Sequence, residues 1–481
     1  MKLSHFLGAL VVSCSITVLA VCLLAPVSSP VLKEVDQATN DPRSASPEDR
    51  RVRRAVGLPE TSFRIGGPVS LTARSSKQTS SDERLVLFEL SADAAAETKA
   101  APVNLAIVMD RSGSMQGARI ENAKRAAQAA IAKLRVGDRL AVVTFDTRAE
   151  RVFVGEIDRG TTRSDAARAV EGIRLGGDTC ISCGLDLALP WLAGADGVRR
   201  VVLLSDGDAN NGVRDLDGFR ALGDSAAKAA ATITSVGLDV HYNEKILSAL
   251  SEASNGRHIF SDRPEDLADV FGDEASRLAA SVADQAEVRF TLPRSVELVA
   301  VADRAFTREG NVVRVALGAL SRGEKKTILV RLRTRGVDTE GLVTDFRYVD
   351  AVSGQGVSHS ATIGLTTQDE LDPAVTERAA RSEAAAALRE ANELMDAGRF
   401  DEARARLGAA RTAIAATASA PSMATAMATA TAVASDFDRQ LDTLQRAEQS
   451  LPLATSRAAS SSRALQSQKK KNWTASRELG F

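Results

Sequence analysis

Nearly continuous apolar runs alternate with helix-like stretches between residues 103 and 280, and this alternation constrains the fold more than any other feature. The runs cover residues 103–109, 140–145, 201–204 and 231–236. A strand without alternating polar residues is expected to be buried on both faces, as in a parallel sheet covered by helices. Strands and helices that alternate along the chain build such a sheet. We therefore predict a doubly wound, Rossmann-like α/β unit over residues 99–280.

The segments on both sides of this unit have the alternating pattern of antiparallel strands. Residues 285–368 contain apolar residues at every second position, as in Val288, Phe290 and Leu292, separated by glycine-containing turns. Residues 58–98 also contain strand-like stretches. We predict that both segments form one antiparallel β-sandwich, into which the α/β unit is inserted.

The N-terminal segment differs in composition from the predicted folded units. Residues 1–30 contain an apolar run over residues 6–27, which has about the length of a bilayer-spanning helix and also resembles a secretory signal. Two alternatives follow, a cleaved signal peptide and an N-terminal membrane anchor. Either predicts an exported protein, periplasmic or extracellular. Residues 31–57 are rich in Pro, Ser, Asp and Arg and predict a flexible linker.

The C-terminal part of the chain is rich in alanine and is predicted to be helical over residues 372–450. Asp372-Pro373 is typical of a helix start, and Gly398 separates two helical patterns. The spacing resembles a single tetratricopeptide unit, but one such unit cannot form a solenoid. We expect a helical hairpin packed on the β domain or on another chain. Residues 451–481 are predicted to be a disordered tail.

Composition and motifs argue against several classes of function. The chain of 481 residues has 61 basic and 62 acidic residues, so there is no electrostatic case for nucleic-acid binding. It contains no glycine-rich phosphate loop with a lysine, which argues against a nucleotide site. None of its four histidines stands in a plausible pairing with a nucleophile motif. We therefore predict that the protein is not an enzyme.

Five polar residues are placed where predicted buried strands end. Asp110, Ser112 and Ser114 follow the first apolar run, and Thr179 and Asp206 lie in two further strand-end loops. Ligands of open α/β sheets bind at the carboxyl ends of the strands. An all-oxygen set with few charges suits Mg²⁺, with Mn²⁺ and Ca²⁺ as alternatives. The sequence therefore predicts a metal site at this edge of the sheet.

This constellation resembles the metal-ion-dependent adhesion site (MIDAS) of von Willebrand factor A (VWA) domains, which joins a DxSxS loop to a distant Thr and a distant Asp. Asp110, Ser112 and Ser114 match the loop, Thr179 matches the threonine and Asp206 matches the second aspartate. The resemblance implies that the hydroxyl groups ligate the metal, directly or through water. The carboxylates would hold metal-bound waters or ligate directly. One coordination position would stay open for an Asp or Glu of a partner protein.

The order of β strands, A domain and β strands adds a looser resemblance. It is similar to bacterial proteins related to calcium-activated chloride channel regulators and inter-alpha-trypsin inhibitor heavy chains. Together these resemblances imply a metal-dependent protein-binding module for adhesion or complex assembly at the cell envelope. A structural assembly protein with a stabilising metal and a metal-assisted hydrolase are the alternatives.

Cys180 and Cys183 directly follow the matching threonine. Two alternatives are open, a local disulfide that fixes the loop and two reduced, half-buried cysteines at a helix start. Redox catalysis is not favoured because no thioredoxin-like pattern surrounds the pair. The neighbouring Asp178 is expected to cap the helix that follows, and the alternative is that it adds a negative charge near the metal.

Overall fold

A computed structural model describes most of the chain from residue 60 onward. The described residues are 60–77, 82–96, 102–238, 242–261, 263–335, 341–365, 372–421, 423, 431–451 and 463–480. The predicted signal or anchor over residues 1–30 and the linker over residues 31–57 lie outside them. Among the described residues, no helix is both long enough and apolar enough to cross a bilayer.

The α/β unit is built on a six-stranded sheet with the strand order β6-β5-β4-β7-β8-β9. Its strands are β4 (Val103–Asp110), β5 (Arg139–Phe145), β6 (Ala149–Glu156), β7 (Val198–Ser205), β8 (Ala231–Leu238) and β9 (His258–Ser261). All neighbours in this sheet are parallel except β5 and β6. Every residue of β4 and β8 is buried, as expected for central strands with both faces covered. The predicted doubly wound fold is confirmed.

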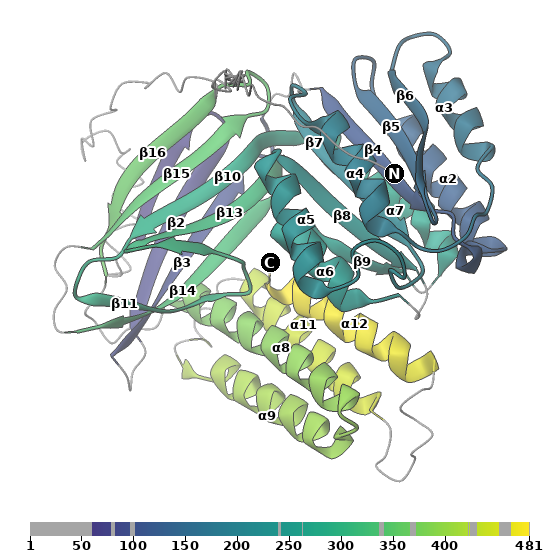
Figure 1. Cartoon of the computed structure of the whole chain (residues 1–481). Coiled ribbons are helices and arrows are strands. Elements are labelled where there is room, and N and C mark those ends of the chain that lie inside the picture. The colour runs from purple at the N-terminus through teal and green to yellow at the C-terminus, as the bar shows by residue number, and fades with distance from the viewer. Residues whose placement is uncertain are drawn as a thin grey trace, which may run out of the picture. The chain divides into compact units, whose positions relative to one another are not determined.

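Helices cover the two faces of this sheet and create two separate cores (Figure 1). The first core contains residues of α2 (Ala118–Lys133), α3 (Thr162–Glu171) and α7 (Leu267–Ala279). The second core contains residues of α4 (Ile181–Leu192), α5 (Leu216–Lys228) and α6 (Glu244–Ala253). Strand β4 supplies both, since Ile107 faces the first core and Ala106 and Val108 face the second. This is the two-residue period of a strand, applied to an apolar run.

Two five-stranded antiparallel sheets form the β-sandwich. The first contains β1 (Glu60–Gly66), β2 (Val69–Lys77), β3 (Glu83–Ala92), β14 (Lys325–Thr334) and β11 (Val296–Ala302), in that spatial order. The second contains β12 (Thr307–Glu309), β13 (Val312–Ser321), β10 (Ser281–Thr291), β15 (Leu342–Asp350) and β16 (Gly356–Ile363). The inner faces share one core, in which the rings of Phe88 and Phe290 stack with centroids 5.8 Å apart.

The sandwich is assembled from chain segments on both sides of the α/β unit. Strand β3 precedes that unit and β14 follows it, yet they pair antiparallel from Glu83–Arg333 to Ser91–Lys325. The α/β unit is therefore inserted between strands of one sheet. Strand β10 begins two residues after α7 ends, so the inserted unit leads directly back into the sandwich.

Helices follow the sandwich in the described part of the chain and share a core rich in alanine and leucine. They include α8 (Pro373–Asp396), α9 (Phe400–Ala418), α11 (Thr431–Gln449) and α12 (Arg463–Gly480). Asp372 caps α8 by accepting hydrogen bonds from the backbone N–H groups of Ala374 and Val375, as its sequence predicts. Helix α8 contacts α9, α11 and α12.

Helix α12 corrects the prediction that residues 451–481 are a disordered tail. Leu465 and Leu479 are buried in the helical core. Two charged residues between them form ion pairs, because Lys470 pairs with Glu244 of α6 and Arg477 pairs with Glu252 of the same helix. The charge that suggested disorder is therefore used in contacts with a distant part of the chain.

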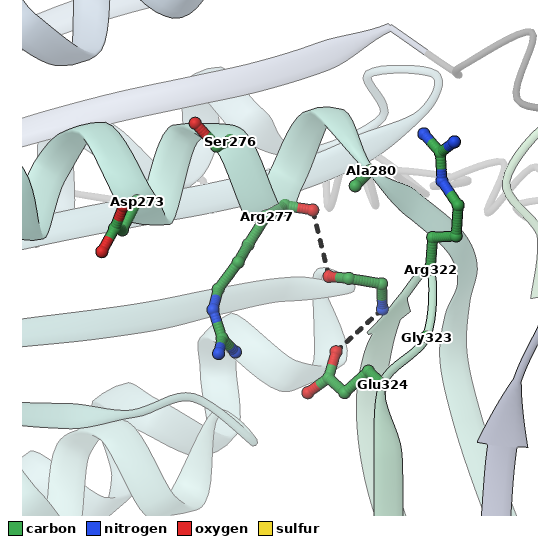
Figure 2. A pocket seen from close by; sticks show the side chains of 8 residues that line it. Asp273, Ser276, Arg277, Ala280, Arg322, Gly323 and Glu324 are labelled. Atoms are coloured by element: carbon green, nitrogen blue, oxygen red, sulfur yellow. Dashed lines mark hydrogen bonds between the residues drawn. The ribbon is translucent and has the colours of Figure 1, made fainter. Parts of the chain in front are cut away.

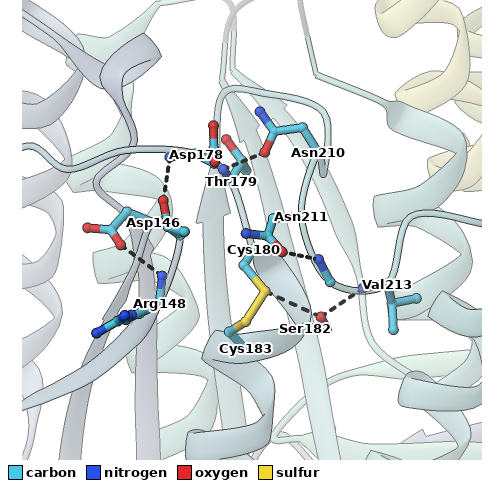
Figure 3. The surroundings of a disulfide bond; sticks show 12 residues. Asp146, Arg148, Asp178, Thr179, Cys180, Ser182, Cys183, Asn210, Asn211 and Val213 are labelled. Carbon is cyan, nitrogen blue, oxygen red and sulfur yellow. Dashed lines mark hydrogen bonds between the residues drawn. A yellow bond between two sulfur atoms is a disulfide. The ribbon is translucent and has the colours of Figure 1, made fainter.

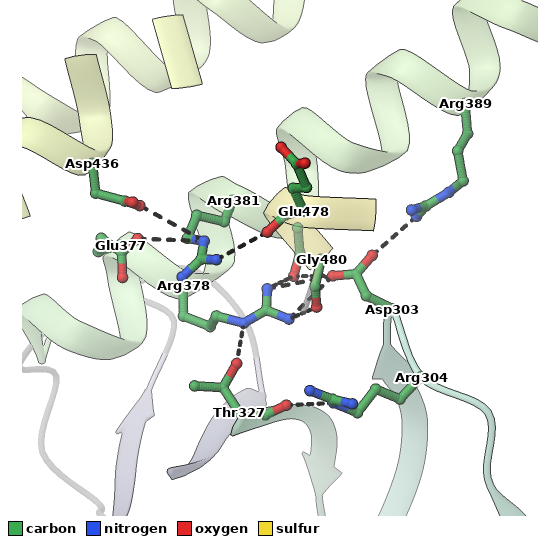
Figure 4. A network of polar contacts seen from close by, with 11 residues as sticks. Asp303, Arg304, Thr327, Glu377, Arg378, Arg381, Arg389, Asp436, Glu478 and Gly480 are labelled. Atoms are coloured by element: carbon green, nitrogen blue, oxygen red, sulfur yellow. Dashed lines mark hydrogen bonds and ion pairs between the residues drawn. The ribbon is translucent and has the colours of Figure 1, made fainter. Parts of the chain in front are cut away.

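A buried ionic network joins the sandwich to the helices (Figure 4). Asp303, in the loop after β11, lies 3.3 Å from Arg378 and 3.0 Å from Arg389, both on α8. Arg378 also donates to the Thr327 hydroxyl at 2.9 Å and to the carbonyl of Gly480 at the end of α12. The guanidinium group of Arg378 on α8 therefore contacts both the sandwich and the end of α12.

Candidate metal site

Asp110 is the last residue of β4 and its side chain is fully buried. One carboxylate oxygen accepts from the backbone N–H of Ser112 at 2.8 Å, and the other accepts from the Ser205 hydroxyl at 2.7 Å. Burial raises the pKa of Asp110 to about 6, although the hydrogen bonds from Ser112 and Ser205 lower it. Both oxygens are therefore held in place by the loops on either side.

The two serines of the DxSxS loop connect Asp110 to Asp206. The hydroxyl oxygens of Ser112 and Ser114 lie 2.9 Å apart, within hydrogen-bonding distance. The Ser114 hydroxyl then donates to a carboxylate oxygen of Asp206 at 2.6 Å. Ser112, Ser114 and Asp206 thus form a continuous row of oxygen atoms beyond the ends of β4 and β7.

Thr179 reaches the same place from the loop before α4. Its backbone N–H donates to the side-chain oxygen of Asn210 at 2.8 Å, and its carbonyl accepts from the backbone of Asn210 and Asn211 (Figure 3). A Cβ atom placed on Gly207 would lie 3.6 Å from the Ser114 hydroxyl oxygen and 3.7 Å from that of Thr179. All five residues predicted from the sequence are therefore brought together.

Arg119 is a further polar residue at this site, and no sequence motif identifies it. It lies in the first turn of α2 and donates to Asp206 at 3.0 Å and to the carbonyl of Ser114 at 2.6 Å. Burial raises the pKa of Asp206, whereas Ser114 and Arg119 lower it. The only sequence signal for Arg119 is its position five residues after Ser114, and helical periodicity does not show in which direction its side chain points.

The donors fit a hard divalent cation. They are three hydroxyl groups and two carboxylates, all oxygen, which is the ligand type that Mg²⁺, Mn²⁺ and Ca²⁺ prefer. Across the described residues there is no group of three or more His, Cys, Asp or Glu side chains that could hold a metal ion. A metal at the candidate site would therefore depend on Ser112, Ser114 and Thr179 as much as on the carboxylates.

A disulfide joins Cys180 and Cys183 beside Thr179 (Figure 3). Cys180 is the N-cap residue of α4, and no side chain caps this helix. The prediction that Asp178 caps it is wrong, because Asp178 lies two residues too early; its own N–H donates to the Thr147 hydroxyl at 3.0 Å. Ser182, between the cysteines, accepts from the backbone N–H of Val213 at 3.1 Å.

The disulfide loop and the loop after β7 are packed closely. A Cβ atom on Gly212 would lie 2.3 Å from the Ser182 hydroxyl oxygen and 2.6 Å from the sulfur of Cys180. The loop that carries Asp206 can therefore approach the loop that carries Thr179 only because residue 212 is glycine.

A separate open pocket of about 410 Å³ lies where α7 meets the turn between β13 and β14 (Figure 2). Its charged lining is mixed, with Asp273 and Glu324 beside Arg277 and Arg322. None of its lining residues belongs to the candidate metal site. The mixed charge favours no particular class of ligand.

Comparison with known proteins supports the assignment of the α/β unit. The sequence model of the von Willebrand factor type A domain matches residues 105–209, a range that contains all five candidate site residues. The uncharacterized protein sll0103 of Synechocystis sp. is 29% identical over 304 residues, covering 60% of this chain and 71% of that protein. YfbK of Escherichia coli, also uncharacterized, is 24% identical over 39% of this chain and 33% of its own length.

Two solved structures resemble the chain beyond the α/β unit. The von Willebrand factor type A protein from Catenulispora acidiphila superposes with a TM-score of 0.63 at 19% identity, over 80% of this chain and 92% of its own. The ArnB paralog VWA2 from Sulfolobus acidocaldarius gives a TM-score of 0.54 at 17% identity, over 79% and 98%. At these identities the likeness concerns the fold. The fold, the domain match and the DxSxS loop agree that the α/β unit of this chain is similar to von Willebrand factor type A domains.

Proposed function

We propose that the protein is a metal-dependent protein-binding module. Proteins with VWA domains commonly bind a divalent metal and a protein partner. In this chain, Ser112, Ser114 and Thr179 would hold Mg²⁺, with Mn²⁺ or Ca²⁺ as alternatives, while Asp110 and Asp206 would bind it directly or through water. An Asp or Glu of the partner would complete the metal's coordination. The observation that carries this proposal is the convergence of three hydroxyl groups and Asp206 around Gly207.

The balance of charge favours binding of an anionic group over catalysis. Hydroxyl ligands are neutral, so a divalent ion held partly by them keeps positive charge that attracts a carboxylate. For catalysis, a nucleophile would need a general base within hydrogen-bonding reach. The two histidines that the structure describes do not supply one. His258 is buried between Ser235 and Tyr242, and His359 lies on strand β16 of the sandwich. We propose that the protein is not an enzyme.

The proposed place of action is the cell envelope. The apolar run over residues 6–27 supports export to a periplasmic or extracellular position, with residues 1–30 acting as a cleaved signal or as an anchor. Cell fractionation with N-terminal sequencing of the recovered protein tests this. Recovery of the full-length chain from the cytosol would contradict it.

Loss of one hydroxyl ligand tests the metal site. Ser114→Ala removes a proposed ligand together with the hydrogen bond to Asp206, so we expect Mg²⁺ affinity to fall at least ten-fold, about 1.4 kcal/mol or more. Isothermal titration of the full chain measures this. Ser225→Ala, which makes the same change at an exposed position on α5, is the control and should bind as the wild type does. Equal affinity in both variants would rule out the proposed ligand set.

Partner capture separates the binding function from its alternatives. EDTA and Asp110→Ala should both abolish capture of the partner in a pull-down from envelope extracts while the fold, followed by circular dichroism, survives. If EDTA instead changes only the sedimentation or thermal stability of the full chain, the metal is structural. Turnover of a substrate that is lost in the Ser114 variant would favour the metal-assisted hydrolase.

A further inference from the structure

Arg119 places a positive charge directly against the candidate metal site. Its guanidinium group donates to Asp206 at 3.0 Å and to the carbonyl of Ser114 at 2.6 Å, so it contacts two of the five site residues. The Asp206 side chain is 0% exposed and that of Arg119 is 28% exposed. Water therefore screens this pair only in part, and the charge of Arg119 acts on the site at short range.

The neighbouring arginine does not act in the same way. Arg111 stands inside the DxSxS loop, but its guanidinium lies 2.9 Å from Asp146 and 3.3 Å from Glu150. Its charge is matched by carboxylates that belong to no part of the proposed ligand set. Arg119, by contrast, shares Asp206 with the metal site, so its charge enters the electrostatic balance of that site.

Arg119 changes the net charge that a bound cation would meet. The ionised carboxylates of Asp110 and Asp206 together with Arg119 carry one negative charge, whereas the two carboxylates alone would carry two. A divalent ion therefore leaves the site with one net positive charge, and without Arg119 it would leave the site neutral. A net positive site attracts an anionic ligand more strongly and holds the cation itself less strongly.

We propose that Arg119 sets the specificity of the site for an acidic partner, and that it does so at the expense of affinity for the metal. This inference rests on the proposed metal-dependent binding function. It identifies Arg119 as a residue that strengthens recognition of a carboxylate on the partner. A purely orienting role, in which Arg119 only holds Asp206 in place, makes the opposite prediction for the metal.

Two substitutions separate charge from orientation. Arg119→Gln removes the charge and keeps an amide group that can donate to Asp206 or to the Ser114 carbonyl. Arg119→Lys keeps the charge and shortens the reach. Arg125→Gln makes the same change of net charge on an exposed residue two turns further along α2, and is the matched control. Circular dichroism and thermal unfolding establish that each variant is folded.

The experiment uses Mn²⁺ as the metal probe and the full chain. Relaxation of water protons reports Mn²⁺ binding, and its decrease on adding N-acetylglutamate reports displacement of metal-bound water by a carboxylate. N-acetylglutamine α-amide, which has no carboxylate, is the neutral control ligand. We expect Arg119→Gln to bind Mn²⁺ roughly ten-fold more tightly, since a unit charge acts on a divalent ion at short range even in a high dielectric. The same variant should bind N-acetylglutamate several-fold more weakly, and Arg119→Lys should resemble the wild type.

The outcomes distinguish this inference from the function on which it rests. A wild type that binds no Mn²⁺ overturns the proposed metal site and the inference together. If the wild type binds Mn²⁺ but Arg119→Gln binds it more weakly, Arg119 orients Asp206 and the inference fails alone. Equal affinities in the wild type and Arg119→Gln, or an equal effect of Arg125→Gln, also overturn it. N-acetylglutamate binding that is equally strong in the wild type and in Arg119→Gln would overturn it as well.

Discussion

Gly212 is a single residue on which the contact between two loops of the candidate site depends. Its φ is +69°, a left-handed conformation that favours glycine, and a Cβ there would lie 2.3 Å from Ser182. We predict that Gly212→Ala lowers the free energy of unfolding by about 2–4 kcal/mol, measured by urea denaturation. Gly354→Ala is the control, because Gly354 has φ +68° with nothing within 4 Å of its Cβ. Equal costs at both positions would show that only the backbone conformation matters.

His258 predicts a specific dependence of stability on pH. Its ring nitrogens lie 2.8 Å from the Ser235 hydroxyl and 3.0 Å from the Tyr242 hydroxyl, and burial, aided by Lys470, lowers its pKa to about 3. Unfolded histidine titrates near 6.5, so the unfolded chain binds more protons below that pH. The stability from neutral His258 is complete above pH 6.5 and is lost as the pH falls toward 3.

The measurement is the free energy of unfolding between pH 7 and pH 4. We expect the wild type to lose up to about 1.4 kcal/mol per pH unit more than His258→Gln, because glutamine cannot be protonated. The comparison between the two proteins removes the contribution of the carboxylates that titrate in the same range. Parallel pH profiles would contradict the buried, neutral state of His258.

The sequence identified the residues of the candidate site better than it identified their surroundings. Asp110, Ser112, Ser114 and Asp206 follow strands of a parallel sheet, whose ends must meet at one edge. Thr179 was matched through the resemblance to the VWA site, since its loop follows α3 and not a strand. Arg119 and the packing of Gly212 against Ser182 depend on the direction of side chains in three dimensions. No pattern along the chain encodes that direction, so these features appear only in the structure.

Among the elements, α12 is held by polar contacts along one side of α6. Lys470 is buried, donates to the Tyr242 carbonyl and to Glu244, both at 2.7 Å, and lies 3.6 Å from the centre of the Tyr242 ring. Trp473 donates to Ser248, and Arg477 pairs with Glu252 one turn further on. The three residues on α12 are three and four positions apart, and their partners on α6 are four and four positions apart in the same order. The two helices therefore run parallel.

Removing the charge of Lys470 tests the contact between α12 and α6. Lys470→Met leaves Glu244 and the Tyr242 carbonyl without their donor, and we predict a loss of about 1–3 kcal/mol in the free energy of unfolding. Faster amide hydrogen exchange in residues 463–480 should accompany it. Lys228→Met, at an exposed position on α5, is the control and should cost less than about 0.5 kcal/mol, the usual range for surface changes. A similar small cost for both variants would contradict the contact.

The sequence of the same helix explains why a disordered tail was predicted there. Residues 463–480 contain many Ser, Gln, Lys and Arg residues and only two leucines, which is the composition of a solvated tail. Their charges are matched by Glu244 and Glu252, more than 200 positions earlier in the chain. Composition is a local property, so it cannot reveal a partner at that distance.

At the scale of the whole molecule, Asp303 connects the sandwich to the helices. It is 3% exposed and faces Arg378 and Arg389 of α8. Asp303→Asn keeps the shape but leaves the buried guanidinium of Arg378 without its counter-charge, and we predict a loss of about 3–5 kcal/mol. Differential scanning calorimetry measures this. Asp217→Asn, which removes a carboxylate that is 90% exposed, should have little effect; comparable losses would argue against the network.

The insertion of the α/β unit between β3 and β14 also determines when the sandwich can form. During synthesis the chain grows from its N-terminus. Glu83 of β3 can therefore pair with Arg333 of β14 only after 250 more residues have been added. At the usual rate of synthesis this delay lasts roughly ten to fifty seconds. The α/β unit forms from contacts that are local by comparison, and once folded it brings its own two ends together and shortens the loop that must close. We therefore expect β3 to stay unpaired with β14 until the α/β unit has folded, and the sandwich to form after it.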